Sequence, residues 1–469
     1  MAGFIDTVYL NSPIFIQQAL VAAYGWQWYR RRFNPSFHQQ VAEFTARDRW
    51  TAEQFRQYED EKLTELLKVA TRSSYYRTIF AEAGVTPDMP PREALAKLPF
   101  LSKNTLRTRS KELLTQDPLP KGVFIQRSSG STGTPTEIYY TPDLHAYEVA
   151  LPEARTMHWA GVNYQDRRVM FGARKVCHPD QALPPFWRFS PAEDLAYGSI
   201  YHLSRQNLPS YMAFLREFKP TVVMGYPNAL NVLARYALRT GDMPAPAKVV
   251  VTTSETVTTQ LRENIEAAWQ CRLFDRYGAI EGCVFAFQCE HGRYHVASEA
   301  GIIEIVDPHG RPCAPGEVGE LVCTGLRNQL QPLFRYRLGD AARWAVEQCC
   351  PCGREMAILE DIQGRIEDMC YTPDGRQVLR FDTVFKGVTN IREAQVIQEK
   401  PDLFIIKVVP AEGYNEHDSA TLKHNMQLHV GHVRTEVELT DAIARRQSGK
   451  FQAVVCKLSP EEIEKLIKL

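Results

Sequence analysis

The sequence predicts an α/β fold: a large N-terminal α/β domain that includes a β-rich subdomain, followed by a small C-terminal α/β domain. Three observations support this prediction. The chain has 469 residues, which is too long for one ordinary hydrophobic core. Helix-like and strand-like stretches alternate between residues 144 and 252, as they do around a mostly parallel sheet. From Ile302 the pattern changes to short strands and turns, and residues 396–469 alternate strand and helix again.

The predicted elements follow in a regular order along the chain. Apolar residues spaced three and four apart predict helices at 50–70, 75–83, 144–160, 210–217, 230–240, 420–430 and 460–469. Short apolar runs predict strands at 123–126, 137–141, 168–172, 221–225, 248–252, 272–274, 301–306, 319–325, 396–398 and 403–409. Leu101 and Ser102 are expected to open a further helix, and residues 372–376 to form a hairpin-like turn.

The composition describes an ordinary globular protein and argues against several classes. Lysine and arginine together number 55, as do aspartate and glutamate, which disfavours a general nucleic-acid-binding protein. Residues 1–6 show no basic region ahead of an apolar run, and no stretch reaches the ~18 apolar residues that span a bilayer. The 11 cysteines suit reduced thiols better than a disulfide framework. We therefore expect a cytoplasmic protein, either a monomer or a homodimer.

Residues 13–33 form an aromatic and apolar segment that ends in Arg30, Arg31 and Arg32. Such a segment can lie on a membrane surface, with its aromatics at the headgroups and its arginines on anionic lipid. Gln17, Gln18 and Gln27 interrupt it, and packing against its own domain is the commoner arrangement. Membrane-surface contact is the less favoured of these two interpretations.

A loop of small hydroxyl and glycine residues lies between two of the predicted strands, at residues 128–136. Its glycines allow backbone angles closed to other residues, and its amides and hydroxyls can surround an anion such as a triphosphate. The candidate phosphate-binding residues are Ser128, Ser129, Gly130, Ser131, Thr132, Gly133 and Thr134. The pattern differs from the common nucleotide loop, because no Lys-Ser or Lys-Thr pair and no helix follow it. The alternative is a flexible surface loop.

Four further stretches accompany this loop, and together they resemble a known family. They are Tyr277-Gly278-Ala279-Ile280-Glu281-Gly282, Tyr336-Arg337-Leu338-Gly339-Asp340, Gly364-Arg365-Ile366-Glu367-Asp368 and Ser448-Gly449-Lys450. In this order and at these separations they are similar to the adenylate-forming superfamily of acyl-CoA synthetases and ligases. The resemblance is to phenylacetate–CoA ligase-like proteins, and within them to the group associated with capsular polysaccharide biosynthesis. It covers the chain from about Trp50 to Phe451.

The resemblance implies an ATP-dependent reaction in which a small-molecule carboxylate becomes an acyl-adenylate, with release of pyrophosphate. The acyl group would then pass to coenzyme A or to an amine. Glu281 would hold Mg²⁺, Tyr277 and Gly278 would flank the adenine, and Ser254 and Glu255 would lie beside it. Asp340 would bind the ribose hydroxyls, and Arg365 the ribose or a phosphate.

The resemblance also implies a mobile C-terminal domain that carries the catalytic Lys450. Residues 1–363 would bind ATP and the carboxylate, and residues 364–469 would form a lid that swings to bring Lys450 to the α-phosphate. Glu367 or Asp368 would be the hinge. Thr136 departs from the wider superfamily, which commonly has lysine after the proline of the loop.

Other interpretations of these residues stay open. Tyr277 could be a core aromatic, Asp340 a turn former, Glu281 a charge at a helix N-terminus, and Lys450 a solvated surface cation. The rival functions are a non-catalytic binding protein of a polysaccharide locus and an ordinary P-loop ATPase. The acyl pocket is expected around Tyr226, Asn228 and Ala279 by analogy with the family.

A separate group of cysteines and histidines predicts a metal site. Cys289 and His295 flank a short turn, and Cys350 and Cys352 belong to a Cys-Pro-Cys-Gly knuckle. These four side chains could complete a tetrahedral, structural Zn²⁺ site, and Cys349 or His291 could replace one of them. The alternative is a cluster of reduced thiols without metal.

Overall fold

The computed structural model describes residues 8–127, 136–255, 257–307, 309–363, 370–378, 381–388, 390–443 and 454–468. Several predicted site residues lie outside the described residues: Ser128 to Thr134, Arg365, the proposed hinge at Glu367 and Asp368, and Lys450.

The central element is a sheet to which twelve of the described strands contribute, in the order β11-β12-β13-β14-β10-β9-β8-β7-β6-β3-β5-β4. Strands β5, β3, β6, β7 and β8 run parallel to one another, and the remaining neighbours pair antiparallel. Their bounds are β3 (Arg168–Gly172), β4 (Trp187–Ser190), β5 (Leu195–Ser199), β6 (Val222–Gly225), β7 (Val249–Thr253), β8 (Arg272–Gly278), β9 (Phe285–Gln288), β10 (Tyr294–Val296), β11 (Gly301–Val306), β12 (Gly319–Gly325), β13 (Tyr336–Trp344) and β14 (Ile358–Gln363). The predicted β-rich part is therefore hydrogen-bonded to the parallel part through β8 and β9.

Three helices pack against the parallel part of the sheet: α9 (Leu208–Phe218), α10 (Pro227–Thr240) and α11 (Thr259–Trp269). The sequence sets their limits in a recognisable way. Helix α10 has Pro227 in its first turn, where no amide donor is needed, and ends at Gly241 in the left-handed conformation. Its inward face, which includes Leu230 and Leu233, is fully buried in the core.

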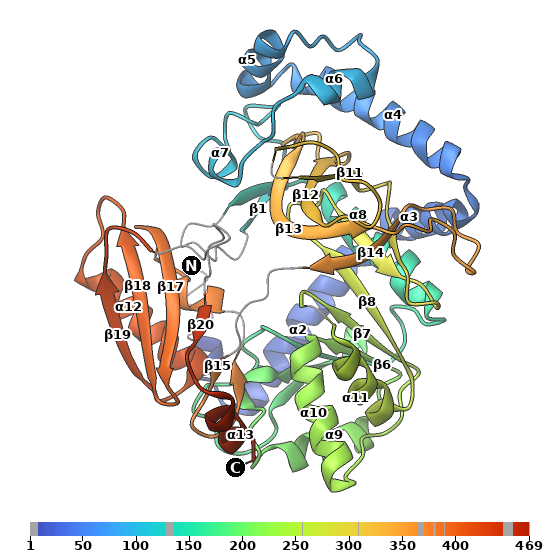
Figure 1. Cartoon of the computed structure of the whole chain (residues 1–469). Coiled ribbons are helices and arrows are strands. Elements are labelled where there is room, and N and C mark those ends of the chain that lie inside the picture. The colour runs from blue at the N-terminus through green and yellow to red at the C-terminus, as the bar shows by residue number, and fades with distance from the viewer. Residues whose placement is uncertain are drawn as a thin grey trace.

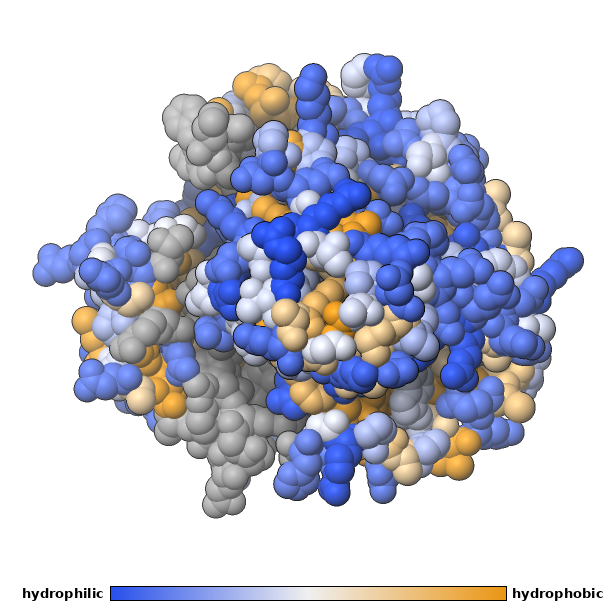
Figure 2. Space-filling view, turned by 90° about the horizontal axis from the view of Figure 1, so that it is seen from above, coloured by the Kyte–Doolittle hydropathy of each residue, from blue (hydrophilic) through white to orange (hydrophobic). Residues whose placement is uncertain are grey.

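The N-terminal part of the chain contributes helices that pack against both ends of the central sheet. They are α2 (Ile14–Arg32), α3 (Pro35–Ala46), α4 (Ala52–Ala70), α5 (Ser74–Ala83), α6 (Pro91–Lys97) and α7 (Lys103–Thr108). A capping box of Thr51 and Gln54 opens α4, and the Ser102 hydroxyl caps α7, as predicted. Helices α4 to α7 lie above β11 to β13 in Figure 1. Figure 2 shows this face from above, where most side chains are hydrophilic and hydrophobic ones gather in separate groups.

The predicted helix at 144–160 is divided in the structure. Helix α8 (Pro142–Pro152) ends at a proline and continues as one π-helical segment, η2 (Glu153–Met157). The buried Arg155 lies in this segment and is paired with Asp48 and Glu299. Periodicity alone could not reveal the break, because both halves are buried.

A small C-terminal domain has its own four-stranded sheet, in the order β19-β18-β17-β20. Its elements are β15 (Cys370–Tyr371), β16 (Gln377–Val378), β17 (Ile391–Lys400), β18 (Leu403–Pro410), α12 (Glu416–Val430), β19 (Arg434–Leu439), β20 (Val454–Cys456) and α13 (Pro460–Lys468). The predicted turn at 372–376 joins β15 to β16, and the predicted strand at 396–398 is the middle of the longer β17. Figure 1 shows this domain beside the central sheet, in orange and red.

The remaining short elements are the antiparallel pair β1 (Phe124–Arg127) and β2 (Glu137–Tyr140), and the 3₁₀ turns η1 (Arg47–Arg49), η3 (Pro191–Glu193), η4 (Ile200–His202) and η5 (Phe381–Phe385). Among the described residues, no helix combines the length and the apolar character needed to cross a membrane.

Candidate active site and metal centre

Predicted site residues follow three neighbouring parallel strands at the carboxyl edge of the sheet. Tyr226 and Asn228 come directly after β6, Ser254 and Glu255 come directly after β7, and Gly278 ends β8. Because the carboxyl ends of parallel strands meet at one edge, the fold brings these positions together. This edge is where open α/β sheets bind their ligands.

Hydrogen bonds connect two of these loops. The Glu255 carboxylate accepts from both the backbone nitrogen and the Nδ2 of Asn228, each at 3.1 Å. It therefore lies at the N-terminus of α10, where a negative charge is favoured. The neighbouring Ser254 has a φ of +73°, which is uncommon for a residue other than glycine. Such strain is typical of positions that a binding site requires.

Tyr277 and Asp340 contact each other, although 63 positions separate them in the chain. The Tyr277 hydroxyl donates to Asp340 Oδ2 at 2.6 Å. Burial raises the pKa of Tyr277 well above its usual value, so the phenol keeps its proton and acts as the donor. The predicted strand at 272–274 is too short, because β8 runs to Gly278 and includes Tyr277, and Asp340 lies within β13, for which no strand was predicted.

The turn after β8 positions Glu281. The Gly282 amide donates to the Ala279 carbonyl at 2.9 Å, and Gly282 has a φ of +66°. Glu281 is only 5% exposed, and its Oε1 accepts a hydrogen bond of 2.9 Å from the Tyr336 hydroxyl. A buried carboxylate oriented in this way provides hard oxygen ligands, which suit Mg²⁺.

A second tyrosine, Tyr140, contacts the backbone of the same turn. The Tyr140 hydroxyl lies 2.6 Å from the Ile280 carbonyl and also contacts Glu148 Oε1. A phenol has one hydrogen, so both contacts are hydrogen bonds only if Glu148 is neutral and supplies the second proton. Burial raises the pKa of Glu148 to about 8, which agrees with a neutral carboxyl. A Cβ at Gly282 would lie 2.9 Å from Glu148 Oε1, so only glycine fits there without a shift.

Sequence reasoning assigned no role to Tyr336, Tyr140 or Glu148. Tyr336 stood at the start of a quoted motif, and its fixed distance from Asp340 was the available signal. Glu148 had a weaker signal: it is a carboxylate among the apolar residues of α8. Only the fold shows that these side chains converge on the Glu281 turn.

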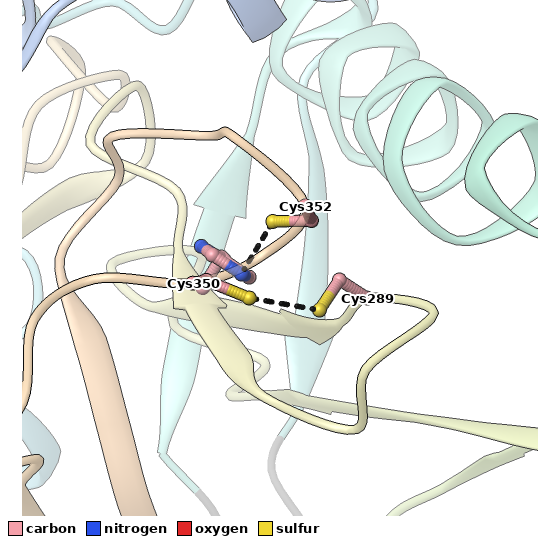
Figure 3. A group of neighbouring side chains, drawn as sticks. Cys289, Cys350 and Cys352 are labelled. Carbon is pink, nitrogen blue, oxygen red and sulfur yellow. Dashed lines mark hydrogen bonds between the residues drawn. The ribbon is translucent and has the colours of Figure 1, made fainter.

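The predicted metal ligands come together from three separate segments. Cys289 follows β9, His295 lies on β10, and Cys350 and Cys352 belong to the loop between β13 and β14. Their ligand atoms all lie within 4.8 Å of one another, and the labelled cysteine side chains point toward a shared centre in Figure 3.

The geometry of this cluster suits a tetrahedral metal ion. Cys289 Sγ lies 3.6 Å from Cys350 Sγ, and Cys352 Sγ lies 3.4 Å from His295 Nε2. Four ligands about 2.3 Å from a zinc ion would be about 3.8 Å apart, so only a small adjustment would admit the metal. Cys349 is exposed and is outside the group, and His291 contributes only its backbone amide, which donates to Cys289 Sγ at 3.3 Å.

The family models identify this chain as an adenylate-forming ligase, and its fold agrees with them. Residues 58–328 match the family model described as AMP-binding enzyme, and residues 370–457 match the CapK C-terminal domain. The chain therefore belongs to the AMP-binding enzyme family. Like its relatives in this family, it is an AMP-forming ligase. It falls in the phenylacetate–CoA ligase-like, CapK-like group.

Relatives that cover two thirds or more of this chain support this placement. The protein CapK of Staphylococcus aureus is 23% identical over 95% of this chain and 98% of its own length. The phenylacetate-coenzyme A ligase of Pseudomonas putida is 29% identical over 67% of this chain and 71% of its own length. A solved structure of 2-hydroxyisobutyryl-CoA ligase with 2-HIB-AMP and CoA has a TM-score of 0.56 at 20% identity, over 90% of this chain and 94% of that one. That structure supports the fold.

Proposed function

We propose that this ligase activates a small-molecule carboxylate with ATP and then transfers the acyl group to coenzyme A or an amine. In the first step a carboxylate oxygen attacks the α-phosphorus, the bond between the α- and β-phosphates breaks, and pyrophosphate leaves. The observation that carries the proposal is the convergence of Glu281, Tyr277 and Asp340 at the carboxyl edge of the sheet. Tyr277 and Glu281 belong to one motif and Asp340 to another, about 60 positions later, and a structural role alone would not require the two motifs to meet there.

Each residue has a proposed role that follows from its chemistry. The Tyr277 ring would flank the adenine, with Gly278 beside it, while Ser254 and Glu255 would border the other side. Asp340, held by the Tyr277 hydroxyl, would accept hydrogen bonds from the ribose hydroxyls. Tyr226, Asn228 and Ala279 would shape the acyl pocket.

Glu281 would hold Mg²⁺, which neutralises charge on the phosphates when bound. The residues present fit this ion, because Glu281 offers a buried carboxylate whose orientation Tyr336 fixes.

The phosphates would be bound by Ser128, Ser129, Gly130, Ser131, Thr132, Gly133 and Thr134. Arg365 would reach the ribose or a phosphate, and Lys450 would stabilise charge as the carboxylate attacks. Residues 364–469 would act as a lid that turns between the two half-reactions.

The Cys289, His295, Cys350 and Cys352 cluster would bind one structural Zn²⁺. Three thiols and one imidazole are ligands that zinc prefers, and four protein ligands leave no open position for catalysis.

Carboxylate-dependent exchange of labelled pyrophosphate into ATP tests the proposal. The acids would include phenylacetate, fatty acids, amino acids and uronic acids, with wild type and Lys450→Ala compared in parallel. We expect one acid class to support exchange, and the variant to lose activity by about two orders of magnitude or more. Coenzyme A and amines would then be supplied separately as acceptors. Exchange that is undiminished in the variant would contradict the role of Lys450, and no exchange with any acid class would contradict adenylation.

A further inference from the structure

Helix α2 is attached to the body of the protein through polar side chains. Gln18 donates to the Phe189 carbonyl and accepts from its amide, which pairs the helix with edge strand β4. The buried Gln17 accepts from the Arg188 guanidinium at 3.0 Å. A Cβ at Gly25 would lie 1.9 Å from Ser190 Oγ, so the glycine allows this close approach. The inward face of α2 thus carries amides and a glycine, beside Val21, which packs against the core.

The outward face of α2 carries large apolar side chains, with the exposed Gln27 among them. Phe15 is 74% exposed and Trp26 is 56% exposed, and Ile16 and Leu20 between them are also exposed. At 100° per residue, Phe15, Ile16 and Trp26 lie about 120° to 140° from the direction midway between Gln17 and Gly25. A surface helix of a globular protein ordinarily shows the reverse arrangement, with its apolar stripe inward. Burial within this chain therefore does not explain these side chains.

The charge on α2 is of one sign. Its 19 residues include no aspartate or glutamate, and Arg30, Arg31 and Arg32 form its last turn. Arg32 turns inward toward Glu193, at 3.7 Å, whereas Arg30 and Arg31 are exposed. The Arg30 guanidinium lies over the Trp26 ring at 4.9 Å. The exposed face therefore carries Phe15, Ile16 and Leu20 in the first half of the helix, and Trp26 and the exposed arginines near its end.

We propose that this face of α2 binds the surface of an anionic lipid bilayer, with the helix lying in the plane of the interface. Phe15, Ile16 and Leu20 enter the acyl boundary, and Trp26 and Arg30 lie among the headgroups. Anionic headgroups supply the counter-charge that the helix itself lacks. A second copy of the chain is a poorer occupant, because a symmetric contact would place the same acid-free face opposite the arginines.

Sedimentation of the full-length protein with vesicles tests this proposal. One set contains phosphatidylcholine alone, and the other contains phosphatidylglycerol and phosphatidylcholine in equal amounts. We expect wild type to bind the phosphatidylglycerol vesicles and to be released by high salt. Phe15→Glu and Trp26→Glu, each at an exposed site that does not affect the core, should weaken binding by about tenfold or more.

Val346→Glu is the matched control, since Val346 is 75% exposed in the loop after β13. It should bind vesicles as wild type does. Three outcomes would overturn the proposal: no binding to either vesicle, equal binding by the Phe15 and Trp26 variants, or a dimer in solution that Phe15→Glu dissociates. The last outcome would assign the face to a second copy of the chain.

Discussion

At the scale of single residues, the orientation of Glu281 depends on the Tyr336 hydroxyl. Tyr336 is fully buried, and its removal would leave Glu281 Oε1 without this donor. We expect Tyr336→Phe to raise the Mg²⁺ concentration needed for half-maximal pyrophosphate exchange by about tenfold or more, because partners that orient a metal ligand contribute on this scale. Titration of the exchange rate with Mg²⁺ measures the effect.

Tyr76→Phe is the control for this prediction. Tyr76 is also buried, and its hydroxyl donates to the Pro332 carbonyl at 2.9 Å. The control should lower the melting temperature and leave the Mg²⁺ requirement unchanged. An unchanged requirement in Tyr336→Phe as well would show that Tyr336 does not orient a metal ligand.

Glu148 provides a prediction about the pH dependence of stability. Its pKa is about 8 in the folded protein and 4.5 in the unfolded chain, so between these values only the folded form keeps the proton. The contribution of Glu148 to the free energy of unfolding is therefore fully present below pH 4.5 and is lost as the pH rises toward 8. Glu148→Gln keeps a donor and cannot ionise. Relative to wild type, its free energy of unfolding should rise by about 1.4 kcal/mol per pH unit between about pH 5 and pH 8.

Urea unfolding of both proteins at several pH values measures this difference. The other titrating groups are the same in both proteins, so their contributions cancel. Glu112→Gln serves as the control, because Glu112 is paired with Arg109 at the surface and its pKa is lowered. Its difference from wild type should stay flat over the same range. A flat difference for Glu148→Gln would mean that the carboxyl is already ionised in the folded protein.

Sequence reasoning assigned site roles to Tyr277 and Asp340, which contact each other in the structure, but not to the side chains that support the Glu281 turn. Tyr277, Asp340 and Glu281 belong to motifs with fixed spacing, so each could be identified before the fold was known. Tyr140 and Glu148 belong to no motif, and their contact with the Ile280 turn depends on how α8 packs on the sheet. Periodicity shows that such residues are buried but does not identify their partners.

At the scale of elements, periodicity and capping residues located several helices but not α3 or α11, although Asn34 and Thr258 cap them. Helices α4 and α5 and the start of α7 match their predictions because Thr51, Ser73 and Ser102 cap them. The π-helical segment after Pro152 was not predicted. It carries the buried Arg155, whose ion pairs with Asp48 and Glu299 are long-range contacts. Local sequence does not encode such contacts.

The cysteine cluster adds a side-chain connection between elements that the sheet already joins through the pairing of β10 with β14. It joins the β9–β10 hairpin to the loop between β13 and β14. We expect purified protein to contain about one zinc per chain. Cys352→Ser should lose the metal and lower the melting temperature by about 5 °C or more, because binding energy of a structural metal contributes to folding. Metal analysis and thermal unfolding measure both effects.

Cys349→Ser is the matched control, since the exposed Cys349 is the neighbour of Cys350 and lies outside the ligand group. It should keep the zinc and the wild-type melting temperature. Full metal content in Cys352→Ser, or metal-free wild-type protein with undiminished stability, would support a cluster of reduced thiols instead.

At the scale of the whole molecule, Arg376 connects the small domain to the large one. Its guanidinium donates to the Tyr201 carbonyl in η4 and to the Val430 carbonyl at the end of α12, the latter at 2.6 Å. The Tyr201 ring packs edge-on against His429, with 5.5 Å between ring centroids. A cavity between the domains is lined by Tyr201 and Asn228 on one side and by Arg376 and His429 on the other.

Sequence reasoning found the two domains but not this contact, because nothing near residue 376 indicated a partner 175 positions earlier. We expect Arg376→Ala to loosen the two domains, since a charge-assisted hydrogen bond at each carbonyl is lost. Hydrogen exchange at the amides of residues 200–203 and 427–431 should become about tenfold faster or more.

Arg434→Ala is the control for this prediction, because Arg434 pairs only locally with Glu436 on the exposed strand β19. It should leave exchange at both segments unchanged. Faster exchange at 427–431 alone would mean that Arg376 only holds α12 within the small domain. Faster exchange at both segments would assign Arg376 to the contact that a moving lid must break. In that case a domain rotation would be opposed by a few specific hydrogen bonds rather than by a large apolar interface, which is what repeated opening requires.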